Sequence, residues 1–128
     1  RSFRSVNGTF SVPYNTTVNQ DITISNAAVG DTFLITARLT DTGNSPCVLT
    51  GIFSVLNSNA IGPVATLASS NYDPTYGTIS LSTYGGSTAG IYSSGNGYKF
   101  RLTSFSAGTG GGSPTGTVYW SAVRISSG

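Results

Sequence analysis

Residues that could carry acid–base chemistry are few in this chain. It has four aspartates and no glutamate or histidine. Serine-type triads and zinc hydrolysis rely on histidine, and most glycosidases use a pair of carboxylic acids. The two loop aspartates, Asp41 and Asp73, stand in the turn sequences Asp-Thr-Gly-Asn and Asn-Tyr-Asp-Pro, where the aspartate commonly bonds the nearby backbone. The sequence therefore predicts no catalytic residue, and we expect a protein that is not an enzyme.

Metal-binding residues are equally sparse. Cys47 is the sole cysteine, which excludes an intrachain disulfide and a cysteine-based zinc site. Its apolar neighbours Val48 and Leu49 predict a buried side chain. Calcium needs only oxygen ligands, so Asn71 and Asp73 with backbone carbonyls stay open as an alternative site. Because no loop has the acidic density of a dedicated calcium site, the sequence predicts no metal and no cofactor.

The tyrosines provide the strongest candidates for a ligand-binding site. Four of them fall within or beside the polar stretch 69–97. Tyrosine rings among small polar side chains are typical of recognition surfaces, and they also suit sugars, whose C–H faces pack on rings while their hydroxyls bond Asn and Asp. An alternative is that the rings close the ends of the folded domain. The predicted ligand-binding residues are Asn71, Tyr72, Asp73, Tyr76, Tyr84, Tyr92 and Asn96.

Composition excludes two classes of partner. Charged residues make up 8% of the chain, and the six basic residues are scattered along it, whereas nucleic-acid-binding proteins usually cluster Lys and Arg. No stretch approaches the roughly 20 apolar residues of a membrane helix. We therefore expect no nucleic-acid partner and no membrane insertion. Low charge with 11% aromatic residues also argues against a disordered chain.

Alternating apolar and polar residues predict short strands and no helix. Clusters of Gly, Pro, Asn and Ser separate the segments, and Pro63 predicts that 61–68 lies at a sheet edge. We interpret Asp21, Asp31 and Asp41 as turn residues. The fold class expected is all-β: an antiparallel β-sandwich, a jelly roll of eight to ten short strands, forming one domain over 1–128. The predicted strands are 9–12, 18–25, 31–40, 47–56, 61–68, 77–84, 89–93, 97–106 and 116–126.

Two of these segments, 47–56 and 116–126, are apolar on both faces. A strand of this kind is covered on both sides. A domain of this length rarely has a third layer, so we expect the second sheet on one face and a neighbouring subunit on the other.

The last strand, Gly116-Thr-Val-Tyr-Trp-Ser-Ala-Val-Arg-Ile125, is followed only by Ser-Ser-Gly. Here the chain resembles the C-terminal tip domains of phage tail fibres and related trimeric jelly rolls of tumour-necrosis-factor or C1q type. Such domains usually end with an apolar strand near the threefold axis. The resemblance implies a homotrimer at the tip of a longer fibre that binds a cell-surface receptor, often a glycan.

We therefore expect a non-enzymatic receptor-binding or adhesive tip domain that is extracellular or on a virion surface. Its partners would be a cell-surface glycan or protein receptor and two further copies of the chain. The start at Arg1, without Met, suggests the C-terminal fragment of a longer protein. Two alternatives remain: a monomeric carbohydrate-binding lectin module, and a structural subunit of capsid, decoration or pilus type.

Overall fold

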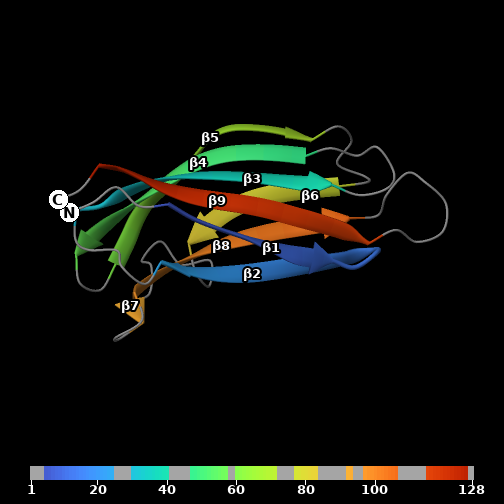
Figure 1. The fold of residues 1–128 in the computed structure, drawn as a ribbon, viewed down its shortest axis with the longest axis horizontal. Coiled ribbons are helices and arrows are strands. Elements are labelled where there is room, and N and C mark those ends of the chain that lie inside the picture. Colours follow the sequence, from blue (N-terminus) through green and yellow to red (C-terminus); the bar gives the residue numbers. More distant parts are fainter. Residues whose placement is uncertain are drawn as a thin grey trace.

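A computed structural model describes residues 5–24, 30–40, 47–57, 60–71, 77–83, 92–93, 97–106 and 115–126. These ranges contain nine strands and no helix, and the strands form two packed antiparallel sheets (Figure 1), which confirms the predicted all-β sandwich. The strands are β1 (Ser5–Val12), β2 (Thr16–Ile24), β3 (Thr32–Thr40), β4 (Cys47–Asn57), β5 (Ala60–Asn71), β6 (Gly77–Thr83), β7 (Tyr92–Ser93), β8 (Gly97–Ser106) and β9 (Gly116–Ser126).

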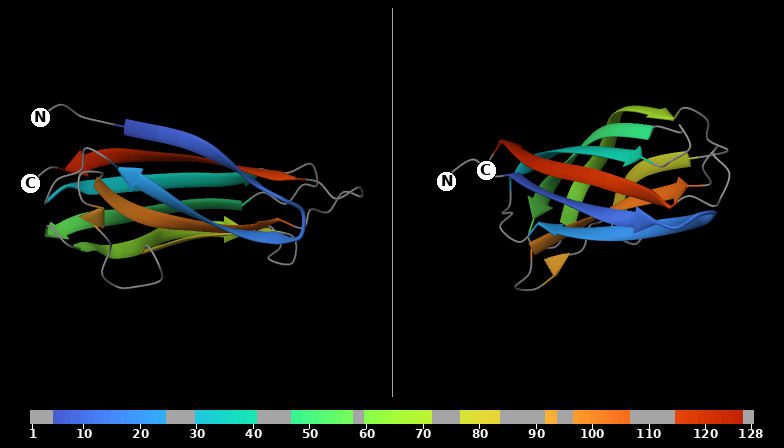
Figure 2. Two further views of the ribbon diagram at one scale, coloured as in Figure 1. Left: turned by 90° about the horizontal axis from the view of Figure 1, so that it is seen from below. Right: turned by 45° about the vertical axis from the view of Figure 1, so that its right-hand side comes forward.

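The larger sheet, sheet A, has the strand order β1-β9-β3-β4-β5, and the smaller, sheet B, has the order β2-β8-β6 with β7 beside β8. Figure 2 shows the two layers from two further directions. The chain changes sheets four times: between β1 and β2, between β2 and β3, between β5 and β6, and between β8 and β9. The consecutive strands β3, β4 and β5 stay together in sheet A, so this part of the chain is a meander. The jelly-roll topology stays a prediction.

Alternation along the strands places one set of apolar side chains between the sheets, because successive side chains of a strand point to opposite faces. In β3 the inward residues are Phe33, Ile35, Ala37 and Leu39, which are the alternate apolar positions of the predicted strand 31–40. The sole cysteine, Cys47, is also buried in this core. Other core residues are Val12, Ile22, Ile24, Leu49, Ile79, Leu81, Phe100, Leu102, Val118 and Ala122.

Trp120 closes the core beside β1. Its ring lies edge-on to Phe100, with the ring centroids 6.3 Å apart and the planes at 85°. Gly8 is its cross-strand neighbour, and a Cβ on Gly8 would lie 2.8 Å from Cζ2 of Trp120. The tryptophan ring therefore occupies space that is free only because residue 8 has no side chain.

Strand β5 forms one edge of sheet A, which confirms the edge position predicted from Pro63. Phe53 is opposite Val64 and Val55 is opposite Ile61. Two residues of β5 therefore stand opposite one residue of β4, as in a β-bulge. Proline is tolerated at such a bulge because it has no N–H to donate to the ladder.

The sandwich has two ends, which are distinguished by the strand ends and turns that lie at each. At the end we call the terminal end, β1 begins at Ser5 and β9 ends at Ser126. At the opposite end, the far end, Val12 is paired with Gly116, and the turn at 13–15 joins β1 to β2 (Figure 2).

Candidate functional site

Most of the predicted ligand-binding residues lie outside the described residues. These are Tyr72, Asp73, Tyr76, Tyr84 and Asn96. The structure places the backbone of the other two: Asn71 ends β5 opposite Cys47, and Tyr92 lies in β7 opposite Tyr98.

Asn71 and Tyr92 lie at opposite ends of the sandwich. Asn71 belongs to the far end, because its partner Cys47 pairs with Leu39, which in turn pairs with Val118 near the start of β9. Tyr92 belongs to the terminal end, since Tyr98 pairs with Ile24 at the end of β2. Figure 1 shows the same separation between the tip of β5 and β7. The structure therefore does not bring these two residues together, and the set as one site stays a prediction.

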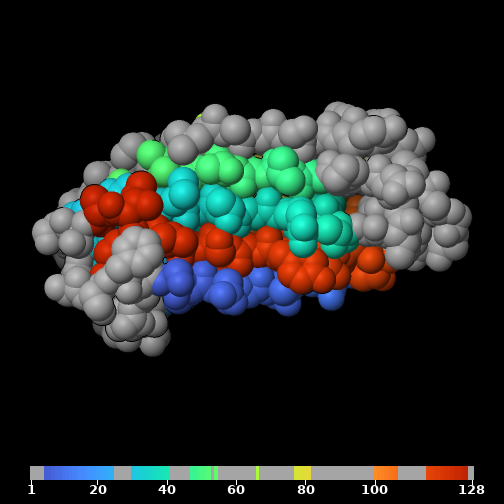
Figure 3. All heavy atoms as spheres, turned by 45° about the horizontal axis from the view of Figure 1, so that its top comes forward, coloured from blue at the N-terminus to red at the C-terminus, as the bar shows by residue number. Residues whose placement is uncertain are grey.

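Apolar side chains gather on the outer face of sheet A, where Figure 3 shows β4, β3, β9 and β1 side by side. Leu34 of β3 has Ile52 of β4 on one side and Val123 of β9 on the other. Ile125, two residues further along β9, is 52% exposed. We call these four residues the Ile125 patch. The patch lies toward the terminal end. Three of its residues are on the outer faces of the two strands that the sequence predicted to be apolar on both sides, and Leu34 of β3 lies between those strands.

A shallow hollow lies on the same face, closer to the far end. Its volume is about 370 Å³. Two rows of cross-strand neighbours form it: a hydroxyl row and, two residues closer to the far end on each strand, a row with one cation and one aromatic ring. We call it the Arg38 hollow. The outward-facing side chains that line it are Thr50, Thr36 and Ser121 in the first row and Val48, Arg38 and Tyr119 in the second.

The geometry of the Arg38 hollow is set by contacts between neighbouring strands. The guanidinium carbon of Arg38 lies 5.3 Å from the centroid of the Tyr119 ring, within the range of a cation–π contact. The hydroxyls of Thr36 and Ser121 share a hydrogen bond of 2.6 Å. In the described part of the chain, no carboxylate lies within ion-pair distance of Arg38. The hollow thus combines an aromatic ring, hydroxyls and one cation.

The alternation in 31–40 puts Arg38 on the face opposite the apolar side chains, and the alternation in 116–126 puts Tyr119 with Val123 and Ile125, but sequence reasoning did not single out Arg38 or Tyr119 as site residues. Alternation along each strand was enough to assign the faces. It could not show that the two residues are cross-strand neighbours, because that depends on the register between β3 and β9.

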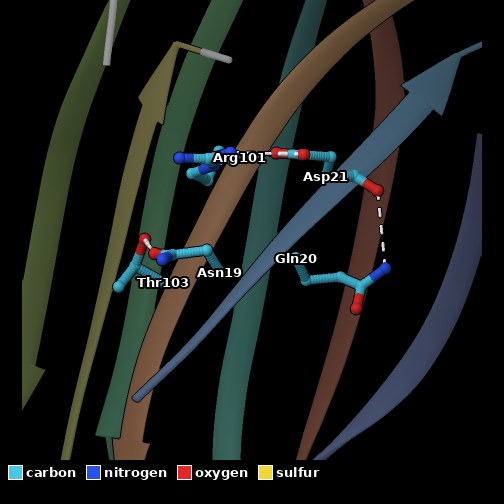
Figure 4. A network of polar contacts seen from close by, with 5 residues as sticks. All are labelled: Asn19, Gln20, Asp21, Arg101 and Thr103. Carbon is cyan, nitrogen blue, oxygen red and sulfur yellow. Dashed lines mark hydrogen bonds and ion pairs between the residues drawn. The ribbon is translucent and has the colours of Figure 1, made fainter. Parts of the chain in front are cut away.

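The outer face of sheet B carries polar side chains of β2 and β8 that pair across the two strands (Figure 4). Arg101 donates from Nε to Oδ1 of Asp21 over 2.8 Å and from a terminal nitrogen to Oδ2 over 3.3 Å. Thr103 donates to Oδ1 of Asn19 over 2.8 Å. Cross-strand hydrogen bonds therefore join β2 and β8 on this face, and Asp21 and Arg101 compensate each other's charge.

The far end holds an exposed tyrosine on an ordered turn. Tyr14 is 44% exposed. The amide of Asn15 donates to the carbonyl of Ser106 over 2.7 Å. The amide of Thr16 donates to the carbonyl of Pro13 over 3.2 Å. Asn15 has a φ of 56°, a left-handed conformation that asparagine adopts more readily than most residues. The turn thus presents Tyr14 from a fixed backbone.

The described ranges contain neither a metal-binding cluster nor a membrane-spanning helix. No group of three or more His, Cys, Asp or Glu side chains comes together there. In those ranges there is also no helix whose length and apolar character would let it cross a membrane. Comparisons with protein-family models, with curated proteins and with solved structures found no match to this chain.

Proposed function

We propose that this chain is a non-enzymatic receptor-binding or adhesive domain of an extracellular or virion surface, and that it works as a homotrimer. The receptor would be a cell-surface glycan or protein. The observation that carries the proposal is the Ile125 patch, an apolar area on the outside of a sheet whose inner face already forms the core.

The Ile125 patch is suited to contact with copies of itself. Around a threefold axis, identical residues approach one another near the axis, so a charged patch would place like charges together. Its four residues are uncharged, and Ile125 is 52% exposed. Fully burying such a side chain contributes about 1.5–3 kcal/mol. A second and third copy would therefore remove apolar surface from water without an electrostatic cost.

The position of the patch also supports a tip domain. Since β1 begins and β9 ends at the terminal end, a preceding fibre would attach there, beside the Ile125 patch. The far end, with Tyr14 and the strand ends of β3, β5 and β8, would then face away from the fibre. That is where an adhesive domain of this kind would meet a receptor.

Sedimentation tests the assembly directly. We expect a solution mass of three times 13.1 kDa, and a mass of one chain for the double variant Val123→Ser with Ile125→Ser. The matched control is Tyr14→Ser, which also replaces an exposed apolar side chain but lies outside the patch and should remain trimeric. A wild-type mass of one chain would contradict the trimer and favour the monomeric lectin. Growth into particles or filaments with concentration would favour the structural subunit.

Binding tests the receptor function separately. The wild-type chain is applied to intact cells and to a panel of immobilised glycans, with a heat-unfolded sample as control. Binding that is lost on unfolding supports an adhesive domain. A folded trimer that binds neither cells nor glycans contradicts it.

A further inference from the structure

We propose that the Arg38 hollow binds a sugar residue that carries a carboxylate, such as a uronic acid or a sialic acid. This inference rests on the proposed receptor-binding function and names the class of its ligand. It uses residues of sheet A, none of which belongs to the ligand-binding set predicted from the sequence.

The guanidinium group of Arg38 would bind the carboxylate of the sugar. Guanidinium groups bind carboxylates through two parallel N–H donors, and such charge-assisted pairs are about twice as strong as neutral hydrogen bonds. Contact with the Tyr119 ring, 5.3 Å from the guanidinium carbon, limits the positions that the long side chain samples. The cation is exposed, and in the described residues the two ion pairs belong to the other arginines, Arg101 with Asp21 and Arg124 with Asp31.

Tyr119 and Val48 supply the apolar contact. Both are exposed, Tyr119 to 46%, and both are direct cross-strand neighbours of Arg38. The C–H face of a pyranose ring packs against such surfaces while its hydroxyls point elsewhere. The row therefore offers a charge in the middle, an aromatic ring on one side and an aliphatic side chain on the other.

The hydroxyl row supplies partners for the sugar hydroxyls. Thr36 stands between Thr50 and Ser121 in the register of sheet A. Each hydroxyl has one donor and two acceptor positions, so the hydrogen bond between Thr36 and Ser121 leaves further positions free on both. These short side chains lie between two rows of larger side chains on the same face, and the resulting depression has room for a sugar ring.

A second copy of this chain is a poorer occupant of the hollow. Of the aspartates that the structure describes, Asp21 is paired with Arg101 and Asp31 is fully buried, so neither offers a carboxylate to Arg38. The hollow borders the Ile125 patch on the same face, because Thr36 of the hydroxyl row is two residues from Leu34 along β3. Arg38 itself is four residues from Leu34, about 13 Å at roughly 3.3 Å per residue. The patch and the hollow are thus two surfaces with different chemistry.

Binding of matched acidic and neutral oligosaccharides tests the inference. The probes are sialyllactose against lactose, and an oligogalacturonate against its methyl ester, each titrated into the wild-type protein by calorimetry. We expect at least one acid to bind at least ten times more tightly than its neutral counterpart, and its binding to weaken as salt rises, because salt screens the exposed charge.

Two variants of Arg38 test whether this residue causes the preference for the acid. Arg38→Gln should lose at least tenfold in affinity for the acid and not for the neutral probe, while Arg38→Lys keeps part of the difference. Arg101→Gln, in sheet B, is the matched control and should leave both affinities unchanged. Circular dichroism checks that each variant stays folded.

The outcomes separate the two proposals. If acid and neutral probes bind equally, or Arg38→Gln changes nothing, the inference is overturned and the receptor function stands. Binding to cells without binding to any glycan points to a protein receptor and also overturns the inference alone. A folded protein that binds no cell and no glycan contradicts both.

Discussion

Arg124 and Asp31 form an ion pair inside the sandwich. Nε of Arg124 lies 3.4 Å from Oδ2 of Asp31, and the two side chains are 4% and 0% exposed. The guanidinium carbon of Arg124 is also 5.9 Å from the centroid of the Phe33 ring. Asp31 was interpreted from the sequence as a turn residue, and it does follow the turn residue Gly30. Its buried carboxylate also neutralises Arg124, an inward-facing cation of β9, which the sequence did not indicate.

Removing one partner of this pair should strongly destabilise the fold. Asp31→Ala leaves a buried arginine without its countercharge, which costs about 3–5 kcal/mol in comparable pairs. Urea unfolding measures the loss. The control is Asp21→Ala, which breaks the surface pair with Arg101, where the side chains are 31% and 25% exposed, and should cost about 1 kcal/mol or less.

A double replacement keeps this prediction testable if Asp31→Ala does not fold. Asp31→Leu with Arg124→Met removes both charges, and buried pairs replaced by apolar residues of similar volume are often as stable as before. We expect the double variant to be more stable than Asp31→Ala. The opposite order of stability would contradict the charge-neutralising role of Asp31.

Gly8→Ala should destabilise the protein by about 1–3 kcal/mol, the usual cost of overpacking a filled site. The added methyl group would overlap the Trp120 ring, 2.8 Å away. Since Trp120 is the single tryptophan, its fluorescence should change as well. Ser11→Ala, at an exposed position of the same strand, should change stability by no more than about 0.5 kcal/mol. Equal stability of the two variants would contradict this packing.

Cys47 should react with thiol reagents only when the domain opens. Its side chain is fully buried in the core, so an aromatic disulfide reagent should modify it quickly in urea and very slowly in buffer. The rate in buffer then reports how often the native state opens far enough to expose the core. Fast modification without denaturant would contradict the burial of β4 beside β3.

The tyrosines predicted from the sequence have their own test. Tyr72→Ala combined with Tyr76→Ala should weaken binding to cells or glycans without changing the melting temperature, because loop rings contribute contact area and not core packing. Unchanged binding would remove both residues from the site. If Arg38→Gln weakens binding and the tyrosine pair does not, the ligand lies on sheet A and not at the loops.

Much of the fold followed from local pattern. The alternation in 31–40 predicted the buried face of β3, and Pro63 predicted the edge position of β5; both are confirmed. The ion pairs of two aspartates could not be predicted from local pattern. Asp21 lies in the middle of β2 opposite Arg101, and Asp31 is buried beside Arg124. Their ion-pair partners are 80 or more residues away. Turn chemistry was the wrong explanation for Asp21, which lies within a strand, whereas Asp31 does follow the turn residue Gly30 and forms its ion pair in addition.

The amino-acid sequence by itself determined the all-β class, the positions of most strands and which side chains of each strand share a face, because these depend on spacing within a few residues. Only the tertiary structure decided which strands are neighbours and in which register. That choice places Arg38 beside Tyr119 and Leu34 between Ile52 and Val123. Pairings of this kind join residues far apart in the chain and depend on how both sheets bury their apolar faces together.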